Sequence, residues 1–322
     1  PACFKQLPQA PASKAAVRAV VFSGGKVFTA GADNTIKIWE FQQNNMKPVH
    51  SVTAPGDVWC MDVCQGVFLF AGCQTSEGGL VKAWNMTSGQ EYELRLNPQT
   101  PSHLERVYAL AANATSGILF SGGGRVNIDE GSDPVIRVWS LDGNAFKCVS
   151  EMKGHRAGIK VLKFIANDQL LVSGSFDGCI GVWNASNGQM IGSITQAHQY
   201  QMYAITSATV SGSEYVFTAG NGSNINVYQL QQDGSLQQAM VHSTKMPKGG
   251  SIFSMTVVAD KAGVPHLICG QNSGHVMVMS LPNMEGKGLW RPHQAEVNCM
   301  ASWPENHAFF LASFDNRFSC YY

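Results

Sequence analysis

The chain has 322 residues, of which 44% are hydrophobic and 14% charged, with 22 basic and 22 acidic side chains. This composition excludes an intrinsically disordered chain and provides enough apolar residues for a large core. Balanced charge argues against nucleic-acid binding through clustered Lys and Arg, and no apolar run reaches the ~18 residues that a membrane span requires. Because the chain opens at Pro1 without a secretory signal, we expect a cytoplasmic or nuclear domain, monomeric within a larger chain or complex.

Short alternating apolar runs recur along the whole chain, and each group of runs closes on an aromatic residue or a replacement for one. Successive closing residues are 42 to 55 positions apart: Trp39, Trp84, Trp139, Trp183, Tyr228, Met279 and Tyr321. Period-two alternation indicates half-buried strands, and a repeat of about 40–45 residues with four strands is typical of a propeller blade. The sequence therefore predicts an all-β fold, a single domain over residues 1–322, with blades starting near residues 17, 58, 107, 159, 202, 252 and 297.

The fourth unit has the most complete pattern. It reads GHRAGIKVLKFIANDQLLVSGSFDGCIGVWN from Gly154 to Asn184, with Gly-His at its start and Trp-Asn at its end. This unit resembles a WD repeat, and the chain is identified as a member of the WD-repeat (WD40) family of seven-bladed β-propellers. The resemblance implies a hydrogen-bonded relay in the blade, which in this sequence only the fourth unit carries complete: His155, Ser173, Asp177 and Trp183.

The last unit ends at Tyr321-Tyr322, after its third strand. An unpaired edge strand is a liability, so a missing fourth strand must come from elsewhere in the chain. As closure in the WD family implies, we expect the N-terminal segment, at about residues 2–8, to pair with the C-terminal blade. Two further segments, 81–84 and 107–110, are similar to propellers of CCCH zinc-finger proteins and of RING-type ubiquitin ligases.

No motif for catalysis is present. His155, Asp177 and Ser173 resemble a hydrolase set, but the serine falls in mid-strand rather than on an exposed turn. The chain has no GxSxG, phosphate-binding loop or HExxH, and its nine histidines lack metal-ligand spacing. The sequence therefore predicts neither an enzyme nor a cofactor or metal site.

When the first strands of the seven units are aligned, the residue at their second position is aromatic in four units. The aligned residues are Arg18, Trp59, Tyr108, Lys160, Tyr203, Phe253 and Asn298. In WD propellers this position faces the mouth of the central channel, so the resemblance implies a surface that stacks on a peptide side chain. The alternative is that these side chains pack between blades and fill a narrow channel.

A glycine-rich insertion at 122–134 in the third unit supplies Asp129, Glu130 and Asp133, which we expect to form an acidic rim. Phe176 and Phe314 precede the turn aspartates of the fourth and seventh units and extend the predicted contact surface. An aromatic surface with an acidic rim favours a partner that offers an Arg or Lys side chain. The insertion could equally be a solvated loop, and its spacing fits no EF-hand calcium loop.

These patterns favour a non-catalytic scaffold that binds a protein or peptide at the channel mouth. Two alternatives stay open at this point: a substrate-recognition subunit of a ubiquitin ligase, and an RNA-associated module of a larger zinc-finger protein. Neutral charge counts against the second alternative, although aromatic side chains can stack on bases.

Overall fold

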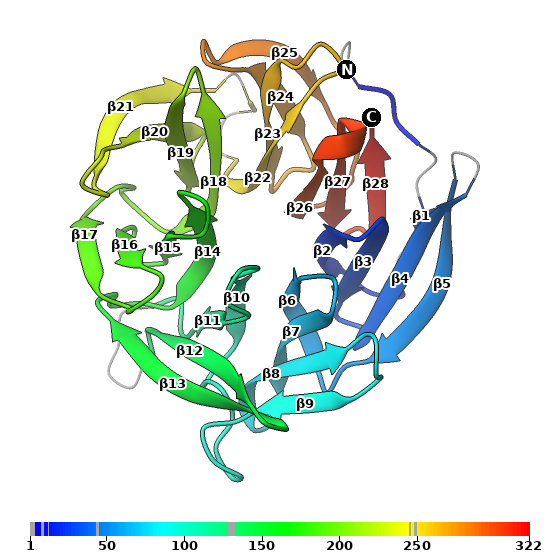
Figure 1. The fold of residues 1–322 in the computed structure, drawn as a ribbon. Helices are drawn as coiled ribbons and strands as arrows, with labels where there is room; N and C mark the ends of the chain where they lie inside the picture. Colours follow the sequence, from blue (N-terminus) through cyan, green and yellow to red (C-terminus); the bar gives the residue numbers. More distant parts are fainter. Residues whose placement is uncertain are drawn as a thin grey trace. The chain divides into compact units, whose positions relative to one another are not determined.

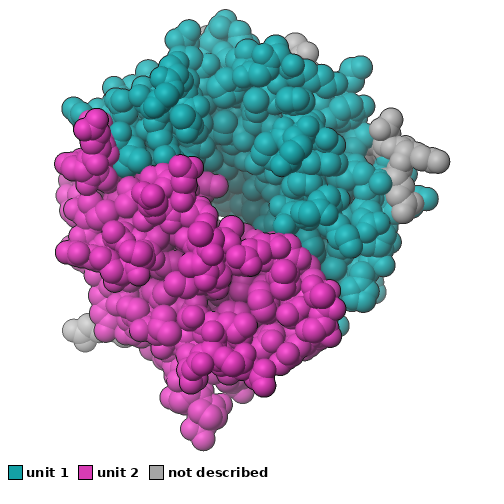
Figure 2. Space-filling view, in the orientation of Figure 1, with its two compact units in different colours: residues 1–53, 203–230, 237–322 teal, residues 54–202, 231–236 magenta. Residues whose placement is uncertain are grey.

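The computed structural model describes residues 4–7, 10–11, 13–42, 45–127, 133–244, 246–247 and 250–322. Regular structure in these residues is β, apart from the single 3-10 turn η1 (Pro304–Asn306). The strands form seven four-stranded sheets, each a blade (Figure 1). The predicted all-β, seven-bladed propeller class is confirmed. The strands divide between two compact units, coloured separately in Figure 2.

Unit 2, residues 54–202 and 231–236, holds the second, third and fourth blades. The second blade consists of β6 (Asp57–Cys64), β7 (Phe68–Thr75), β8 (Gly78–Asn85) and β9 (Glu91–Leu94). The third consists of β10 (Val107–Ala112), β11 (Leu119–Gly123), β12 (Val135–Asp142) and β13 (Ala145–Lys153). The fourth consists of β14 (Ile159–Ile165), β15 (Leu170–Ser175), β16 (Ile180–Asn184) and β17 (Met190–Ile194).

Unit 1, residues 1–53, 203–230 and 237–322, holds the other blades. The first consists of β2 (Val17–Ser23), β3 (Lys26–Gly31), β4 (Thr35–Gln42) and β5 (Asn45–Thr53). The fifth consists of β18 (Met202–Val210), β19 (Ser213–Gly220), β20 (Asn224–Leu230) and β21 (Leu236–Ser243), and its two strand-end residues Met202 and Leu236 fall in unit 2. The sixth consists of β22 (Ile252–Ala259), β23 (Pro265–Gln271), β24 (Val276–Ser280) and β25 (Glu285–Trp290). The seventh consists of β26 (Val297–Trp303), β27 (Ala308–Ser313), β28 (Arg317–Tyr321) and β1 (Ala10–Pro11).

Burial follows strand order within each blade. In the third blade every residue of β11 is buried, whereas most of the outer strand β13 is exposed. Between the second and third blades, Val81, Val107, Leu119 and Trp139 are essentially inaccessible to water. Burying side chains of this size stabilises the fold by about 1.5–3 kcal/mol each. In the third blade, burial thus differs between the inner strand β11 and the outer strand β13.

The N-terminal segment completes the seventh blade in unit 1. Ala10 pairs with Phe318 in β28, and the bonds Lys5 N–H to Tyr322 O (2.8 Å) and Leu7 N–H to Cys320 O (3.0 Å) extend the pairing toward the N-terminus. The predicted closure is confirmed, with pairing that reaches Pro11 and so runs beyond the expected 2–8. Residues 2, 3 and 8 of the expected segment lie outside the described residues.

Candidate protein-interaction surface

The aligned second positions of the first strands are sites where strand pairing is interrupted. In β10, Val107 pairs with Gly123 and Ala109 with Gly122, so Tyr108 has no partner across the ladder. The same shift occurs at Arg18, Trp59, Lys160, Phe253 and Asn298. A β-bulge of this kind turns the extra residue's side chain away from the regular alternation. All seven aligned side chains, Tyr203 included, are half-buried.

In unit 2 the bulge residues are in contact with one another. The rings of Trp59 and Tyr108 meet edge to face with centroids 5.4 Å apart. Lys160 Nζ lies 5.3 Å from the centroid of the Tyr108 ring, and the Arg106 guanidinium carbon lies 4.6 Å from that of Trp59. Arg106, which the sequence pattern did not single out, directly precedes β10 and is exposed. We call Trp59, Arg106, Tyr108 and Lys160 the bulge surface of unit 2.

The two predicted phenylalanines differ in their surroundings. Phe176 is buried, with only 8% of its surface exposed, and its ring stands edge to face against Tyr108 at 5.2 Å. Phe176 is therefore not an exposed part of the predicted contact surface, and its ring packs against that of Tyr108 instead. In unit 1, Phe314 is partly exposed, and its backbone N–H donates to the Glu296 carbonyl at 3.1 Å.

The bulge residues of unit 1 make their own contacts. Tyr203 and Phe253 pack with ring centroids 4.4 Å apart, and the Tyr203 hydroxyl donates to Asn221 Oδ1 at 3.1 Å. Asn298 Nδ2–H donates to the Arg18 carbonyl at 2.7 Å, which links β26 to β2. The structure therefore brings the predicted residues together in three sets: Trp59, Tyr108 and Lys160 in unit 2, and the pairs Tyr203–Phe253 and Arg18–Asn298 in unit 1.

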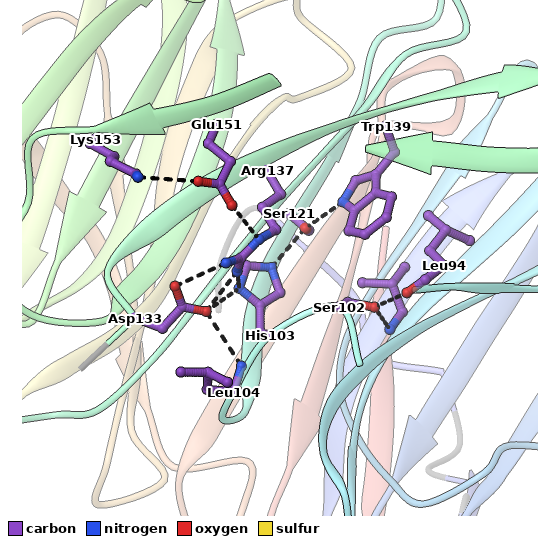
Figure 3. A network of polar contacts seen from close by, with 11 residues as sticks. Leu94, Ser102, His103, Leu104, Ser121, Asp133, Arg137, Trp139, Glu151 and Lys153 are labelled. Carbon is purple, nitrogen blue, oxygen red and sulfur yellow. Dashed lines mark hydrogen bonds and ion pairs between the residues drawn. The ribbon is translucent and has the colours of Figure 1, made fainter. Parts of the chain in front are cut away.

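Asp133 does not form part of an acidic rim. Its side chain is 7% exposed and accepts two hydrogen bonds from Arg137, at 2.6 and 3.1 Å (Figure 3). Burial alone would raise the pKa of Asp133, but its contacts with His103 and Arg137 hold that pKa well below the usual range. The Asp133 carboxylate forms an internal ion pair with Arg137. The expectation that Asp133 belongs to an exposed acidic rim is therefore wrong. Asp129 and Glu130 lie outside the described residues.

The fourth blade contains the implied relay. Ser173 Oγ accepts the Trp183 indole N–H at 2.8 Å and lies 2.8 Å from His155 Nε2, while His155 Nδ1 lies 3.3 Å from Asp177 Oδ2. Burial opposes ionisation of Asp177, yet the contact with His155 and the backbone N–H groups of Arg156 and Cys179 keep its pKa well below the usual range. Ser173 is fully buried, so this set holds strands together and is closed to a substrate.

Two further relays are present that the sequence pattern did not predict. In the third blade, Ser121 Oγ lies 2.8 Å from both the Trp139 indole nitrogen and His103 Nε2, and Asp133 is the acidic member (Figure 3). In the seventh, His293 lies 2.9 Å from both Asp315 and Ser319. The expectation that only the fourth blade is complete was wrong for the third, because the insertion sets Asp133 30 positions after His103 rather than 22.

The described residues hold no group of three or more His, Cys, Asp or Glu side chains suited to a metal ion. No helix in the described part of the chain is long and apolar enough to cross a membrane. The described cysteines, of which Cys60, Cys148, Cys179 and Cys299 are partly accessible, form no disulfide.

Comparison with known proteins agrees with this architecture. The family described as "WD domain, G-beta repeat" matches residues 4–40 and 146–184. Zinc finger CCCH domain-containing protein 62 of Arabidopsis thaliana is 24% identical over 82% of this chain and 56% of its own length. Protein 59 of the same series is 27% identical over 51% of this chain and 30% of its own length. An F-box/WD-40 repeat-containing protein of Arabidopsis is 23% identical over 75% of this chain and 42% of its own length.

The chain thus spans between 30% and 56% of the length of these three relatives. The predicted similarity to CCCH zinc-finger proteins is confirmed, whereas the similarity to RING-type ligases stays a prediction. The two matched segments fall on the first blade and on the third-to-fourth blade region, where the Trp–hydroxyl bonds Trp39–Thr29 and Trp183–Ser173 are intact at 2.8 Å. The matched repeats and the seven four-stranded blades together show a β-propeller with WD repeats in the first blade and in the third-to-fourth blade region.

Proposed function

We propose that the chain is a non-catalytic interaction module that binds a protein or peptide through the bulge surface of unit 2. The observation that carries the proposal is the set of bulges, which place Trp59, Tyr108 and Lys160 side by side and half-exposed. A strand that continued its alternation would have buried or fully solvated these side chains. Large aromatic residues held in a partly desolvated position are the usual anchors of protein interfaces.

Packing beneath the surface supports binding by a preformed site. Tyr108 is held edge to face by Trp59 and by the buried Phe176, at 5.4 and 5.2 Å. Side chains already fixed in the free protein lose little conformational entropy when a partner binds. A non-catalytic role is supported by the relays, whose hydroxyls Ser121 and Ser173 are fully buried.

The test is capture of partners from a cell extract by the chain and by its Tyr108→Ala variant, read by mass spectrometry. Tyr92→Ala is the matched control, because Tyr92 is a half-buried tyrosine of unit 2 in edge-to-face contact with Phe146 at 5.4 Å. We expect partners that Tyr108→Ala loses and Tyr92→Ala keeps, with both variants folded by circular dichroism. Identical partner lists from the two folded variants would remove the bulge surface from the function.

A second candidate, a substrate-recognition subunit of a ubiquitin ligase, is supported by the F-box/WD-40 repeat relative, which aligns over 75% of this chain. In that role the captured set would include ligase components together with a protein that becomes ubiquitinated. Capture that is insensitive to proteasome inhibition and contains no ligase component would rule against this candidate. Binding of RNA is not favoured by the balanced charge of the chain.

A further inference from the structure

We infer that Asn221 is a site of spontaneous covalent modification, at which its side-chain amide reacts with the backbone nitrogen of Gly222 and is converted to a carboxylate. The inference is independent of the proposed function. Asn221 and Gly222 lie between β19 and β20 in unit 1, and both are exposed. The chain has a second Asn-Gly pair, Asn187-Gly188, between β16 and β17 in unit 2. The folded protein surrounds the two pairs differently.

The reaction needs water but no oxidant or reductant. The Gly222 nitrogen attacks Asn221 Cγ, the Cγ–Nδ2 bond breaks, and Nδ2 leaves as ammonia with the proton that Gly222 gives up. The product is a cyclic imide, which water opens at one of its two carbonyls to yield aspartate or isoaspartate. A glycine in the second position favours ring closure, because without a Cβ it adopts backbone conformations that other residues avoid. Gly222 has such a conformation, with φ of 96°.

The amide carbonyl of Asn221 is held by two hydroxyl groups. Its Oδ1 accepts a hydrogen bond from the Tyr203 hydroxyl and another from the Ser251 hydroxyl, each at 3.1 Å. Attack at Cγ builds negative charge on Oδ1, and donors already aimed at such an oxygen lower the barrier. Ser251 is itself buried, and its backbone N–H donates to Asn272 Oδ1 at 3.2 Å. The two donors are therefore in place before the reaction begins.

The Ser251 hydroxyl contacts the attacking nitrogen as well. The Gly222 N–H donates to Ser251 Oγ at 3.4 Å, which is longer than the usual range for such a bond, so the proton is weakly held. As the new C–N bond forms, the Gly222 proton passes to Oγ while the Oγ proton passes to Asn221 Oδ1, and charge is not separated. Among the described residues, no atom beyond the chain neighbours of Gly222 lies within 4 Å of the position that a Cβ would take there, which leaves room for the ring.

The second pair lacks these features. The Gly188 N–H donates to the Asn184 carbonyl at 2.9 Å, an ordinary hydrogen bond that must break before the nitrogen attacks. Asn187 Oδ1 accepts a hydrogen bond from the backbone N–H of Gln189, also at 2.9 Å. Met152 Cγ would stand 3.2 Å from a Cβ at Gly188, so the space beside this nitrogen is filled. We therefore expect the fold to protect Asn187 and to promote the reaction at Asn221.

The test incubates the folded chain at physiological pH and temperature and follows both pairs by peptide mapping with mass spectrometry and isoaspartate analysis. We expect Asn221 to convert about tenfold or more faster than Asn187. Ser251→Ala removes the proton relay, and Tyr203→Phe removes one donor but keeps the ring that packs on Phe253 at 4.4 Å. Each variant should slow conversion of Asn221 about tenfold or more and leave the rate at Asn187 unchanged.

The chain unfolded in urea provides the reference for the sequence alone. There the two pairs should convert at similar rates, because neither keeps its hydrogen bonds. Equal rates at Asn221 and Asn187 in the folded chain would overturn the inference, as would an Asn221 that reacts more slowly folded than unfolded. A Ser251→Ala variant that converts Asn221 as fast as wild type would overturn it too. Formation of aspartate without isoaspartate would show direct hydrolysis of the amide and would exclude the cyclic route.

Discussion

Arg137 Nη1 donates a hydrogen bond to His103 Nδ1 at 2.9 Å, and this contact fixes the imidazole proton on the opposite nitrogen (Figure 3). Arginine can only donate, so Nδ1 must accept and Nε2–H must donate to Ser121. In the fourth blade the partner of Nδ1 is the carboxylate of Asp177, so there Nδ1–H donates and Nε2 accepts. The relays of neighbouring blades therefore run in opposite hydrogen-bonding directions.

Replacing Arg137 with Leu tests how much the third blade depends on this contact. The variant leaves Asp133 buried with no cation, so we expect a loss of about 3–5 kcal/mol in the free energy of unfolding. Urea denaturation monitored by tryptophan fluorescence measures it. Glu151→Gln removes the outer partner of Arg137, which lies at 3.1 Å and is partly exposed, and should cost no more than about 1 kcal/mol. Equal losses in the two variants would contradict the central role of Asp133.

Asp62 should make the stability of unit 2 depend on pH between about 4 and 6. Its two carboxylate oxygens accept the backbone N–H groups of Val63 and Ala112, each at 2.8 Å. Burial nevertheless raises the pKa of Asp62 to about 6, against these bonds and the charge of Lys163. An unfolded aspartate has a pKa of about 3.9, so between these values the folded protein binds the extra proton. This stabilising contribution is complete below pH ~4 and is lost as pH rises through 6.

Comparing wild type with Asp62→Asn isolates that contribution. The stability of wild type relative to the variant should fall by on the order of 1–3 kcal/mol between pH 4 and pH 7. Urea unfolding at pH 4.5, 5.5 and 7 measures the difference. A difference that is constant across this range would show that Asp62 titrates at the same pH in the folded and unfolded chains.

The sequence was sufficient to predict those parts of the structure that depend on the alternation of apolar and polar residues along the strands. Strands, blades and the position of the bulge residues follow from period-two patterns, and aligning first strands located Trp59, Tyr108 and Lys160. The relay of the seventh blade was also accessible, because His293 and Asp315 are 22 positions apart, as are His155 and Asp177. It was missed because its hydroxyl, Ser319, comes from β28 and not from the neighbouring β27.

Side-chain direction was not accessible from the sequence. Whether an aspartate in a glycine-rich insertion is exposed or buried depends on the side chains it contacts in the folded protein. Asp133 is buried because it contacts Arg137 and His103. The contact of the Arg106 guanidinium with the Trp59 ring was likewise not predicted, because Arg106 lies outside the aligned position of the first strands. The preference for a partner that offers an Arg or Lys side chain stays a prediction.

Truncation of the N-terminal segment should destabilise the seventh blade. Phe4 is buried, and its ring stands edge to face against Phe309 at 5.1 Å. Phe4→Ala should cost about 3–5 kcal/mol, and deletion of residues 1–8 should lower the melting temperature further, because backbone pairing with residues 320–322 is lost as well. Lys5→Ala keeps that pairing and should lie within about 0.5 kcal/mol of wild type. A deletion variant that melts with wild type would show that the segment is dispensable.

The second blade lacks the hydroxyl that its tryptophan needs, so supplying one should stabilise the protein. Trp84 is buried, and its indole nitrogen makes no hydrogen bond among the described residues. In other blades the hydroxyl stands across from the residue two positions before the tryptophan, as Ser121 does opposite Arg137 and Ser173 opposite Gly181. In β7 that place, opposite Lys82, is occupied by Ala71.

Ala71→Ser therefore restores the missing acceptor, and we expect a gain of about 0.5–1.5 kcal/mol in the free energy of unfolding. Ala83→Ser is the matched control: Ala83 is also fully buried in this blade, but it faces Phe70 and Tyr92 in the strand register. A hydroxyl buried there without a partner should cost about 1–3 kcal/mol. Calorimetric melting of the two variants compares them directly. A loss of stability in both would show that the site beside Trp84 is too tightly packed for a hydroxyl and that the indole is satisfied in another way.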